Sequence, residues 1–228
     1  MSFMQDPEFG DRIITLMAAL VLVLQISMVG QRWLITNIRM FALQSFLLAS
    51  IAGVIAYFNQ ASHLYIAAFL TLVLKVFVLP PLLERIVERV GIRQEIEPLI
   101  NVPLSILISG CLTLVGYVVA ESFYHPEETS ARTALGHNTL AVAIALFLIG
   151  FFMMLNRRKA LTQVLALLCL ENGLFLAAIS LTYGMPLVVE MGIFFDVLVA
   201  VMVLGILVYR IGETFDSMDV SKLRRLRG

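Results

Sequence analysis

Four ionisable side chains lie inside long apolar runs of this 228-residue chain: Lys75, Glu171, Glu190 and Asp196. A charge at the centre of a bilayer costs about 2.5–3.5 kcal/mol on insertion scales, so such residues face protein or water and usually have partners. Carboxyl and amine groups in such places take up and release protons when their surroundings change. The chemistry that these residue types favour is therefore proton transfer inside a membrane.

The two deepest carboxyls are Glu171 and Asp196. Glu171 lies about 16 Å from the basic end of its apolar run, at 1.5 Å per helical residue. Asp196 lies about 21 Å from the basic end of its own run. We predict that both are proton-relay groups, although each also fits a structural role in a hydrogen bond or a buried pair. Glu190 lies nearer the other end of its run, so it is either a hydrated interfacial carboxylate or an exit-side relay group.

Lys75 lies near the middle of a run that continues to Pro80 and Pro81. Two prolines remove two backbone donors, so the carbonyls four residues before them lose their usual helical partners. Such irregular backbone is tolerated at membrane depth where it faces protein or water. Lys75 then either modulates a neighbouring carboxyl or forms a static ion pair with Glu171 or Asp196.

The composition excludes a soluble domain, a disordered chain and a nucleic-acid-binding protein. Hydrophobic residues make up 60% and charged residues 14%, whereas soluble domains carry about 25% charged residues. Sixteen basic and sixteen acidic residues cancel, so no basic field exists for nucleic acid. Runs of spanning length predict an all-α, polytopic membrane protein with seven transmembrane helices. The predicted spans are 13–29, 40–58, 64–83, 99–120, 139–155, 160–183 and 187–209.

Basic residues fall on one side of these spans. Of sixteen Lys and Arg residues, thirteen lie in alternate loops and the tail, Arg12 and Arg132 lie opposite, and Lys75 lies within a span. The positive-inside rule therefore places the N-terminus outside and the C-terminus in the cytoplasm. Residues 1–12 lack the basic region of a signal peptide, so the first run is expected to remain as a span.

Polar and small residues within the spans have more modest expected roles. Gln25, Gln44 and Gln163 are predicted to form hydrogen bonds between helices rather than to carry protons. Gly173 is expected to permit close helix approach. The two cysteines lie in apolar runs without a cluster of metal ligands, so no cofactor is expected in this chain.

Several short motifs in the last 92 residues occur together in a known family. A basic loop, Asn156-Arg157-Arg158-Lys159, precedes the run Leu-Cys-Leu-Glu-Asn-Gly around Glu171, and a tail begins at Asp216 (DSMDVSKLRRLRG). With these motifs, residues 137–228 resemble the three-helix K subunit of respiratory complex I and its relative in Mrp-type antiporters. The whole chain is similar to the hydrogenase-4 component E family, in which about four further helices precede such a unit. Gln44 and the run Lys75-Val-Phe-Val-Leu-Pro-Pro support that likeness.

The resemblance implies an N-terminal four-helix half (1–120), an outer loop (121–138) and a three-helix half with a cytoplasmic tail (139–228). It also implies a subunit without catalysis of its own, in the membrane arm of a hydrogenase-4 or formate-hydrogenlyase-type oxidoreductase of a prokaryotic inner membrane. The implied partners are other membrane-arm subunits, including antiporter-like proton channels, and a peripheral redox module with nickel–iron and iron–sulfur centres.

By the same resemblance, Glu171 matches the first intramembrane glutamate of the complex I protein. The second acidic position fits Asp196 better than Glu190, so this chain departs from the family by using aspartate or by a shift along the helix. Two alternatives to a hydrogenase-linked proton carrier stay open. One is a subunit of a cation/proton antiporter without hydrogenase, and the other is a structural spacer that moves no proton.

Overall fold

The computed structural model describes residues 7–59, 62–90, 99–123 and 131–182, and these ranges are helical apart from their connecting turns. In the described part, six helical segments are long and apolar enough to cross a membrane. The predicted seventh span, 187–209, lies outside the described residues, as do Glu190 and Asp196. The helices are α1 (Pro7–Gly30), α2 (Leu34–Asn59), α3 (Ser62–Thr71), the π-helix η2 (Leu72–Val78), α4 (Leu79–Val90), α5 (Val102–Ser122), α6 (Ala131–Asn156) and α7 (Ala160–Thr182).

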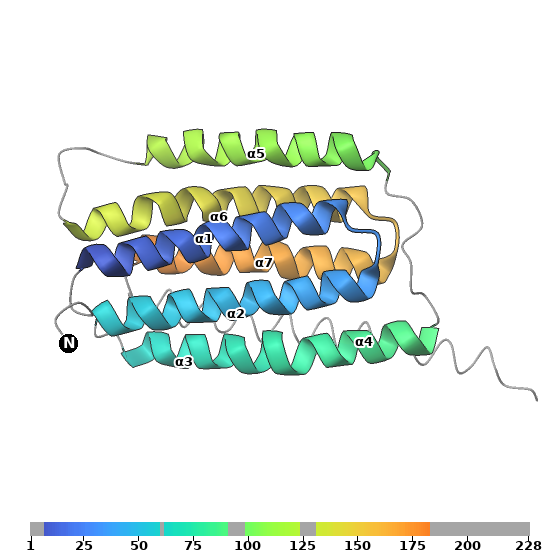
Figure 1. Ribbon diagram of the computed structural model, residues 1–228, viewed down its shortest axis with the longest axis horizontal. Helices are drawn as coiled ribbons and strands as arrows, with labels where there is room; N and C mark the ends of the chain where they lie inside the picture. Colours follow the sequence, from blue (N-terminus) through green and yellow to red (C-terminus); the bar gives the residue numbers. More distant parts are fainter. Residues whose placement is uncertain (1–6, 60–61, 91–98, 124–130, 183–228) are drawn as a thin grey trace, which may run out of the picture.

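The helices lie side by side with their long axes roughly aligned (Figure 1). α5 forms one edge of the bundle, α1, α6 and α7 form its middle, and α2 separates them from the opposite edge. That edge is a single rod, in which α3, η2 and α4 follow one another without a break. Six apolar spans with lipid-facing side chains on the bundle surface indicate a membrane protein.

Several helices extend beyond the spans expected from hydropathy. α2 begins at Leu34 and not at residue 40, α4 continues to Val90, and α6 begins at Ala131, inside the segment 121–138 that was expected to be a loop. The difference has a simple cause. Hydropathy marks the part of a helix that lies in hydrocarbon, whereas helical hydrogen bonding continues into the interface.

The turn between α6 and α7 joins three helices at one end of the bundle. The Asn156 side chain accepts a hydrogen bond from the backbone N–H of Ile100 at 2.9 Å, just before α5. The buried Arg157 guanidinium donates to the carbonyls of Met28 and Val29, both at 3.2 Å. The last carbonyls of a helix lack intrahelical partners, so Arg157 caps the C-terminus of α1.

Most of the described basic residues lie at this same end, where the α1–α2 and α6–α7 turns lie (right in Figure 1). Arg12 and Arg132 lie near the starts of α1 and α6, at the other end, and Lys75 lies in the interior. Arg39 on α2 forms an exposed ion pair with Glu84 on α4 at 3.1 Å. The one-sided distribution of charge predicted from the sequence is therefore a property of the folded bundle. The membrane side that this end faces stays a prediction.

Gly173 allows α7 to lie directly against α6, as the sequence predicted. A Cβ atom added at Gly173 would lie 2.6 Å from the backbone nitrogen of Phe147 and 3.1 Å from the carbonyl oxygen of Ala143. Gly150 makes the reciprocal approach from α6, because a Cβ there would lie 2.7 Å from the Cα of Leu170. Backbone atoms cannot move aside as a flexible side chain does, so these two glycines set the α6–α7 spacing.

We therefore predict that Gly173→Ala destabilises the protein by about 1–3 kcal/mol, because the added methyl must push α6 and α7 apart. The measurement is thermal unfolding of the full chain in detergent. Gly53→Ala on α2 is the matched control, since no atom lies within 4 Å of its added Cβ. Equal melting temperatures for the two variants would contradict the assigned role of Gly173.

Candidate functional site

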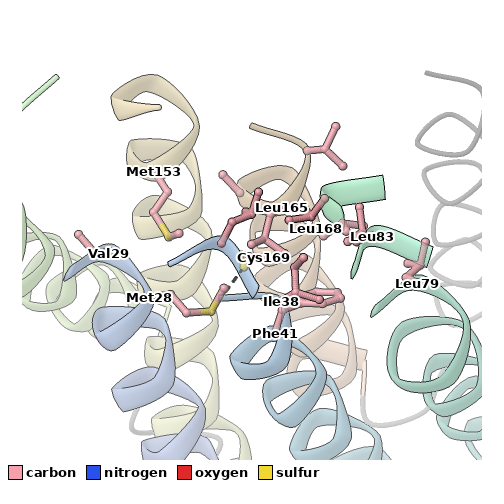
Figure 2. Close-up of a cluster of buried hydrophobic side chains, with 14 of the residues drawn as sticks. Met28, Val29, Ile38, Phe41, Leu79, Leu83, Met153, Leu165, Leu168 and Cys169 are labelled. Carbon is pink, nitrogen blue, oxygen red and sulfur yellow. Dashed lines mark hydrogen bonds between the residues drawn. The ribbon is translucent and has the colours of Figure 1, made fainter. Parts of the chain in front are cut away.

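The interior of the bundle is divided into two apolar clusters with a polar layer between them. Figure 2 shows the cluster nearer the basic end, and the second cluster fills the opposite half. On α2, for example, the first cluster ends at Phe41 and the second begins at Leu48, with Gln44 and Ser45 between them. We call the buried side chains at this depth the mid-membrane polar layer. They are Gln25, Gln44, Ser45, Thr71, Lys75, Glu171 and Asn172.

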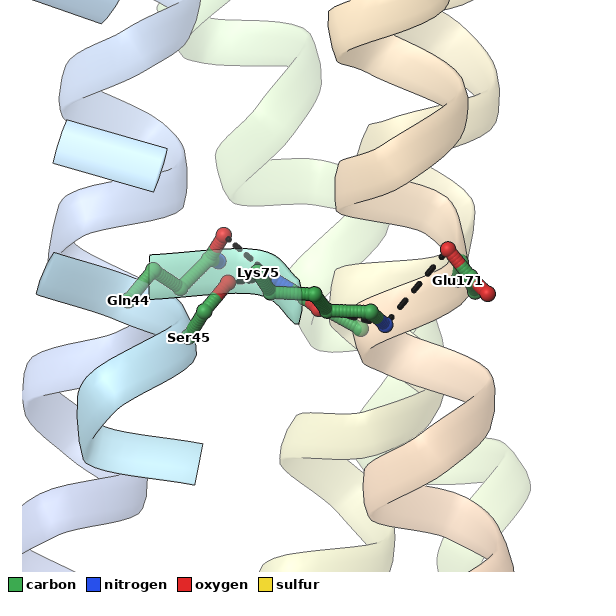
Figure 3. A network of polar contacts seen from close by, with 5 residues as sticks. Gln44, Ser45, Lys75 and Glu171 are labelled. Atoms are coloured by element: carbon green, nitrogen blue, oxygen red, sulfur yellow. Dashed lines mark hydrogen bonds and ion pairs between the residues drawn. The ribbon is translucent and has the colours of Figure 1, made fainter. Parts of the chain in front are cut away.

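An ion pair lies within this layer. Lys75 Nζ is 3.4 Å from Glu171 Oε2, and the two side chains are 2% and 1% exposed. The same ammonium donates a hydrogen bond to Asn172 Oδ1 at 3.2 Å and lies 5.9 Å from the ring centroid of Phe175. A carboxylate, an amide oxygen and the face of an aromatic ring all favour a cation. One short stretch of α7, residues 171–175, therefore supplies three of the groups around the Lys75 ammonium. Figure 3 shows the Lys75 side chain reaching Glu171.

A string of amides leads away from the ion pair across the bundle. Asn172 Nδ2 donates to Gln44 Oε1 and to Ser45 Oγ, both at 3.2 Å. Gln44 Nε2 donates to Gln25 Oε1 at 2.7 Å, and Gln25 Nε2 donates to Met153 Sδ at 3.4 Å. Each amide accepts on the side of Lys75 and donates on the far side. The string therefore has one direction, and it links α7, α2, α1 and α6.

The backbone around Lys75 is a π-helix. The Leu79 N–H bonds to the Leu74 carbonyl, five residues earlier, and Pro80 and Pro81 follow in the first turn of α4. The sequence predicted that these prolines would disturb the backbone, and the disturbance is a widened turn rather than a break. π-Turns inside helices are frequent at functional sites because they redirect side chains. Lys75 lies in the middle of this one and points toward α7.

The structure brings together two of the four ionisable residues singled out in the sequence. Lys75 contacts Glu171, which was one of the two partners considered for it. Glu190 and Asp196 lie outside the described residues, and the relay roles of all four stay predictions. In the described ranges, no three His, Cys, Asp or Glu residues are placed to hold a metal ion.

Two of the three glutamines form hydrogen bonds between helices, as the sequence predicted. Gln25 and Gln44 form a hydrogen bond between α1 and α2. The prediction for Gln163 was wrong: its side chain is exposed, and its amide donates to the Arg157 carbonyl in the adjacent turn. Gln163 lies in the first turn of α7, where the chain connection and not a neighbouring helix supplies the acceptor.

Sequence reasoning missed four members of the site: Ser45, Thr71, Asn172 as a lysine ligand, and Phe175. A signal for Ser45 and Asn172 was present, because each is an uncharged polar residue within an apolar run and lies next to a residue already singled out, Gln44 or Glu171. Polar residues at equal depth in neighbouring spans tend to meet, since each needs a hydrogen-bonding partner in an apolar surrounding.

Residues 138–228 match the family NADH-ubiquinone/plastoquinone oxidoreductase chain 4L. Over its greater part the chain is 34% identical to the uncharacterized protein Rv0085 of Mycobacterium tuberculosis, covering 87% of this chain and 89% of that protein. It is 25% identical to hydrogenase-4 component E of Escherichia coli and of Shigella flexneri, covering 96% of this chain and 99% of those proteins. No solved structure matches the chain significantly.

The buried ion pair predicts a strong coupling between its two members. Lys75→Met leaves Glu171 without this cation at a buried position, and loss of one partner of a buried pair costs about 3–5 kcal/mol. The double variant Lys75→Met with Glu171→Gln removes both charges, so we expect it to be more stable than Lys75→Met alone. Thermal unfolding of the full-length single and double variants in detergent measures the coupling.

The control for this cycle is the exposed pair Arg39–Glu84. Arg39→Met and Glu84→Gln should show a coupling of at most about 1 kcal/mol, because exposed ion pairs contribute little. Additive effects at Lys75 and Glu171 would show that the observed contact contributes no more than this surface pair.

Proposed function

Because this chain belongs to the family of Rv0085 and is a homologue of hydrogenase-4 component E with a C-terminal chain 4L region, we propose that it carries protons within the membrane arm of a hydrogenase-4 or formate-hydrogenlyase-type complex. The observation that supports this proposal is the Lys75–Glu171 pair. Two groups that bind and release protons lie 3.4 Å apart in the mid-membrane polar layer, buried from solvent within the described bundle. The chain supplies no catalytic centre of its own and acts as one subunit of a larger oxidoreductase.

The pair can pass protons because a carboxylate that can accept a proton lies 3.4 Å from an ammonium that can donate one. A proton that reaches the Glu171 carboxylate neutralises it and leaves the Lys75 ammonium without its counter-charge. The ammonium, which has lost this counter-charge, then donates a proton onward. Loss of that proton and return of the carboxyl proton to the amine restore the original pair. One proton has then entered and one has left.

In this proposal, Asp196 is the second carrier and Glu190 is an exit-side group nearer the predicted outer surface. Antiporter-like channel subunits on either side would deliver and receive protons. A peripheral module with nickel–iron and iron–sulfur centres would supply the redox energy. The N-terminus would lie outside and the C-terminal tail in the cytoplasm of a prokaryotic inner membrane. The name of the Escherichia coli relative supports a hydrogenase complex over an antiporter without redox partners.

The proposal predicts that Glu171→Gln lowers ion movement per redox turnover by about tenfold or more in the intact complex, since the amide keeps the shape and abolishes proton exchange. The complex is purified through a tag on this chain and reconstituted in vesicles. Ion movement, redox turnover and the amount of each partner protein are then measured on one preparation. Glu84→Gln is the matched control, because Glu84 pairs with Arg39 at the end of the bundle and lies outside the polar layer.

Unchanged ion movement in Glu171→Gln, with full assembly, would make the chain a structural spacer and reject the proposal. The proteins that co-purify decide a second point. If antiporter-like subunits co-purify without any hydrogenase subunit, the parent complex is a cation/proton antiporter and not a hydrogenase.

A further inference from the structure

Thr71 belongs to the mid-membrane polar layer but takes part in neither the ion pair nor the amide string. Its side chain is 1% exposed, and its Oγ1 has no hydrogen-bond partner within the described ranges of the chain. It is the last residue of α3 and directly precedes the π-helix, where it makes no capping hydrogen bond with its side chain. A buried hydroxyl left without a partner costs about 1–3 kcal/mol.

Other hydroxyls in these helices show that this state is unusual for the protein. Serine and threonine side chains within helices commonly donate to the carbonyl four residues earlier. In the described helices six hydroxyls do so, at 2.7–3.3 Å. They are Ser27, Ser50, Ser109, Thr113, Ser122 and Ser180. Thr71 has the same local option and does not use it.

The position of Thr71 relative to Lys75 suggests what the hydroxyl binds. Residues four apart on a helix lie on one face, and both of these side chains are buried. A buried water needs two to four polar partners. The Thr71 hydroxyl, the Lys75 ammonium and the Glu171 carboxylate provide such partners at one depth of the bundle.

We propose that Thr71 and Lys75 hold a water molecule, and that this hydroxyl and water form the route by which protons enter or leave the Lys75–Glu171 pair on the α3 side. The second half of this inference rests on the proposed function. In each step, one N–H or O–H bond breaks as one O–H bond forms. The Lys75 ammonium gives a proton to the water, and the water gives one to Thr71 Oγ1. The hydroxyl passes its own proton to a second water on the α3 side, where the last O–H bond forms. A hydroxyl both donates and accepts, so it returns to its starting state after each passage.

The test compares Thr71→Val, which removes the hydroxyl at nearly constant size, with Thr71→Ser, which keeps it. Thr113→Val on α5 is the matched control, because the Thr113 hydroxyl bonds to the Ser109 carbonyl far from the ion pair. In the intact reconstituted complex, Thr71→Val should lower ion movement per redox turnover by about tenfold or more. Thr71→Ser and Thr113→Val should keep it near the level of the unchanged protein.

Thermal unfolding of the full chain tests the water independently of transport. Removing a hydroxyl that has no partner would raise the melting temperature, because a buried unsatisfied group is relieved. Removing one that binds water loses that hydrogen bond, so we expect Thr71→Val to melt no higher than the unchanged protein and lower than Thr71→Ser. A clear rise in melting temperature for Thr71→Val would overturn the water site.

Glu171→Gln, measured beside these variants, separates the two proposals. If Glu171→Gln stops ion movement while Thr71→Val does not, the hydroxyl route is wrong and the proposed function stands. If Glu171→Gln leaves ion movement intact, the proposed function fails, and the melting temperatures alone decide whether Thr71 holds a water.

Discussion

The contact between Lys75 and Glu171 is the interaction on which the rest of the bundle depends. Both side chains are buried, and the loss of either one would leave the other without this counter-charge in the bundle interior. The contact joins η2 to α7 at 3.4 Å. The π-turn before the two prolines directs Lys75 toward α7, and the glycine contacts hold α7 against α6.

The amide string holds the Lys75 ammonium in place, and its own members do not exchange protons. Its members accept on one side and donate on the other, so their dipoles reinforce one another along the string. Carboxamides do not titrate near neutral pH and cannot take a proton from the lysine as a carboxylate does. Gln25, Gln44 and Asn172 therefore orient the ammonium and close this side of the layer.

The sequence was sufficient for the six spans that the structure describes and for the buried charges of Lys75 and Glu171. Apolar runs define the spans, and the cost of a buried charge singles out Lys75 and Glu171. The contact between Lys75 and Glu171 could not be predicted from depth alone, because depth does not say which way the Lys75 side chain points. Its direction depends on which face of the rod the π-turn presents, and the hydropathy of the rod contains no such information. Arg157 shows a second limit: by charge alone it only marked a side of the membrane, yet its guanidinium is buried and caps α1.

The polar layer is built from both halves of the chain. This gives a structural reason for the helices that precede the chain 4L region. Glu171 and Asn172 belong to the region that matches chain 4L, residues 138–228, whereas Lys75, Gln44 and Gln25 come from the helices before it. Without those helices, Glu171, Asn172 and Phe175 on α7 would lose their contacts with the Lys75 ammonium. The likeness to hydrogenase-4 component E runs through both halves, covering 96% of this chain. The first half is therefore part of the site itself, because it supplies the lysine and the amides that make a carboxylate tolerable at this depth.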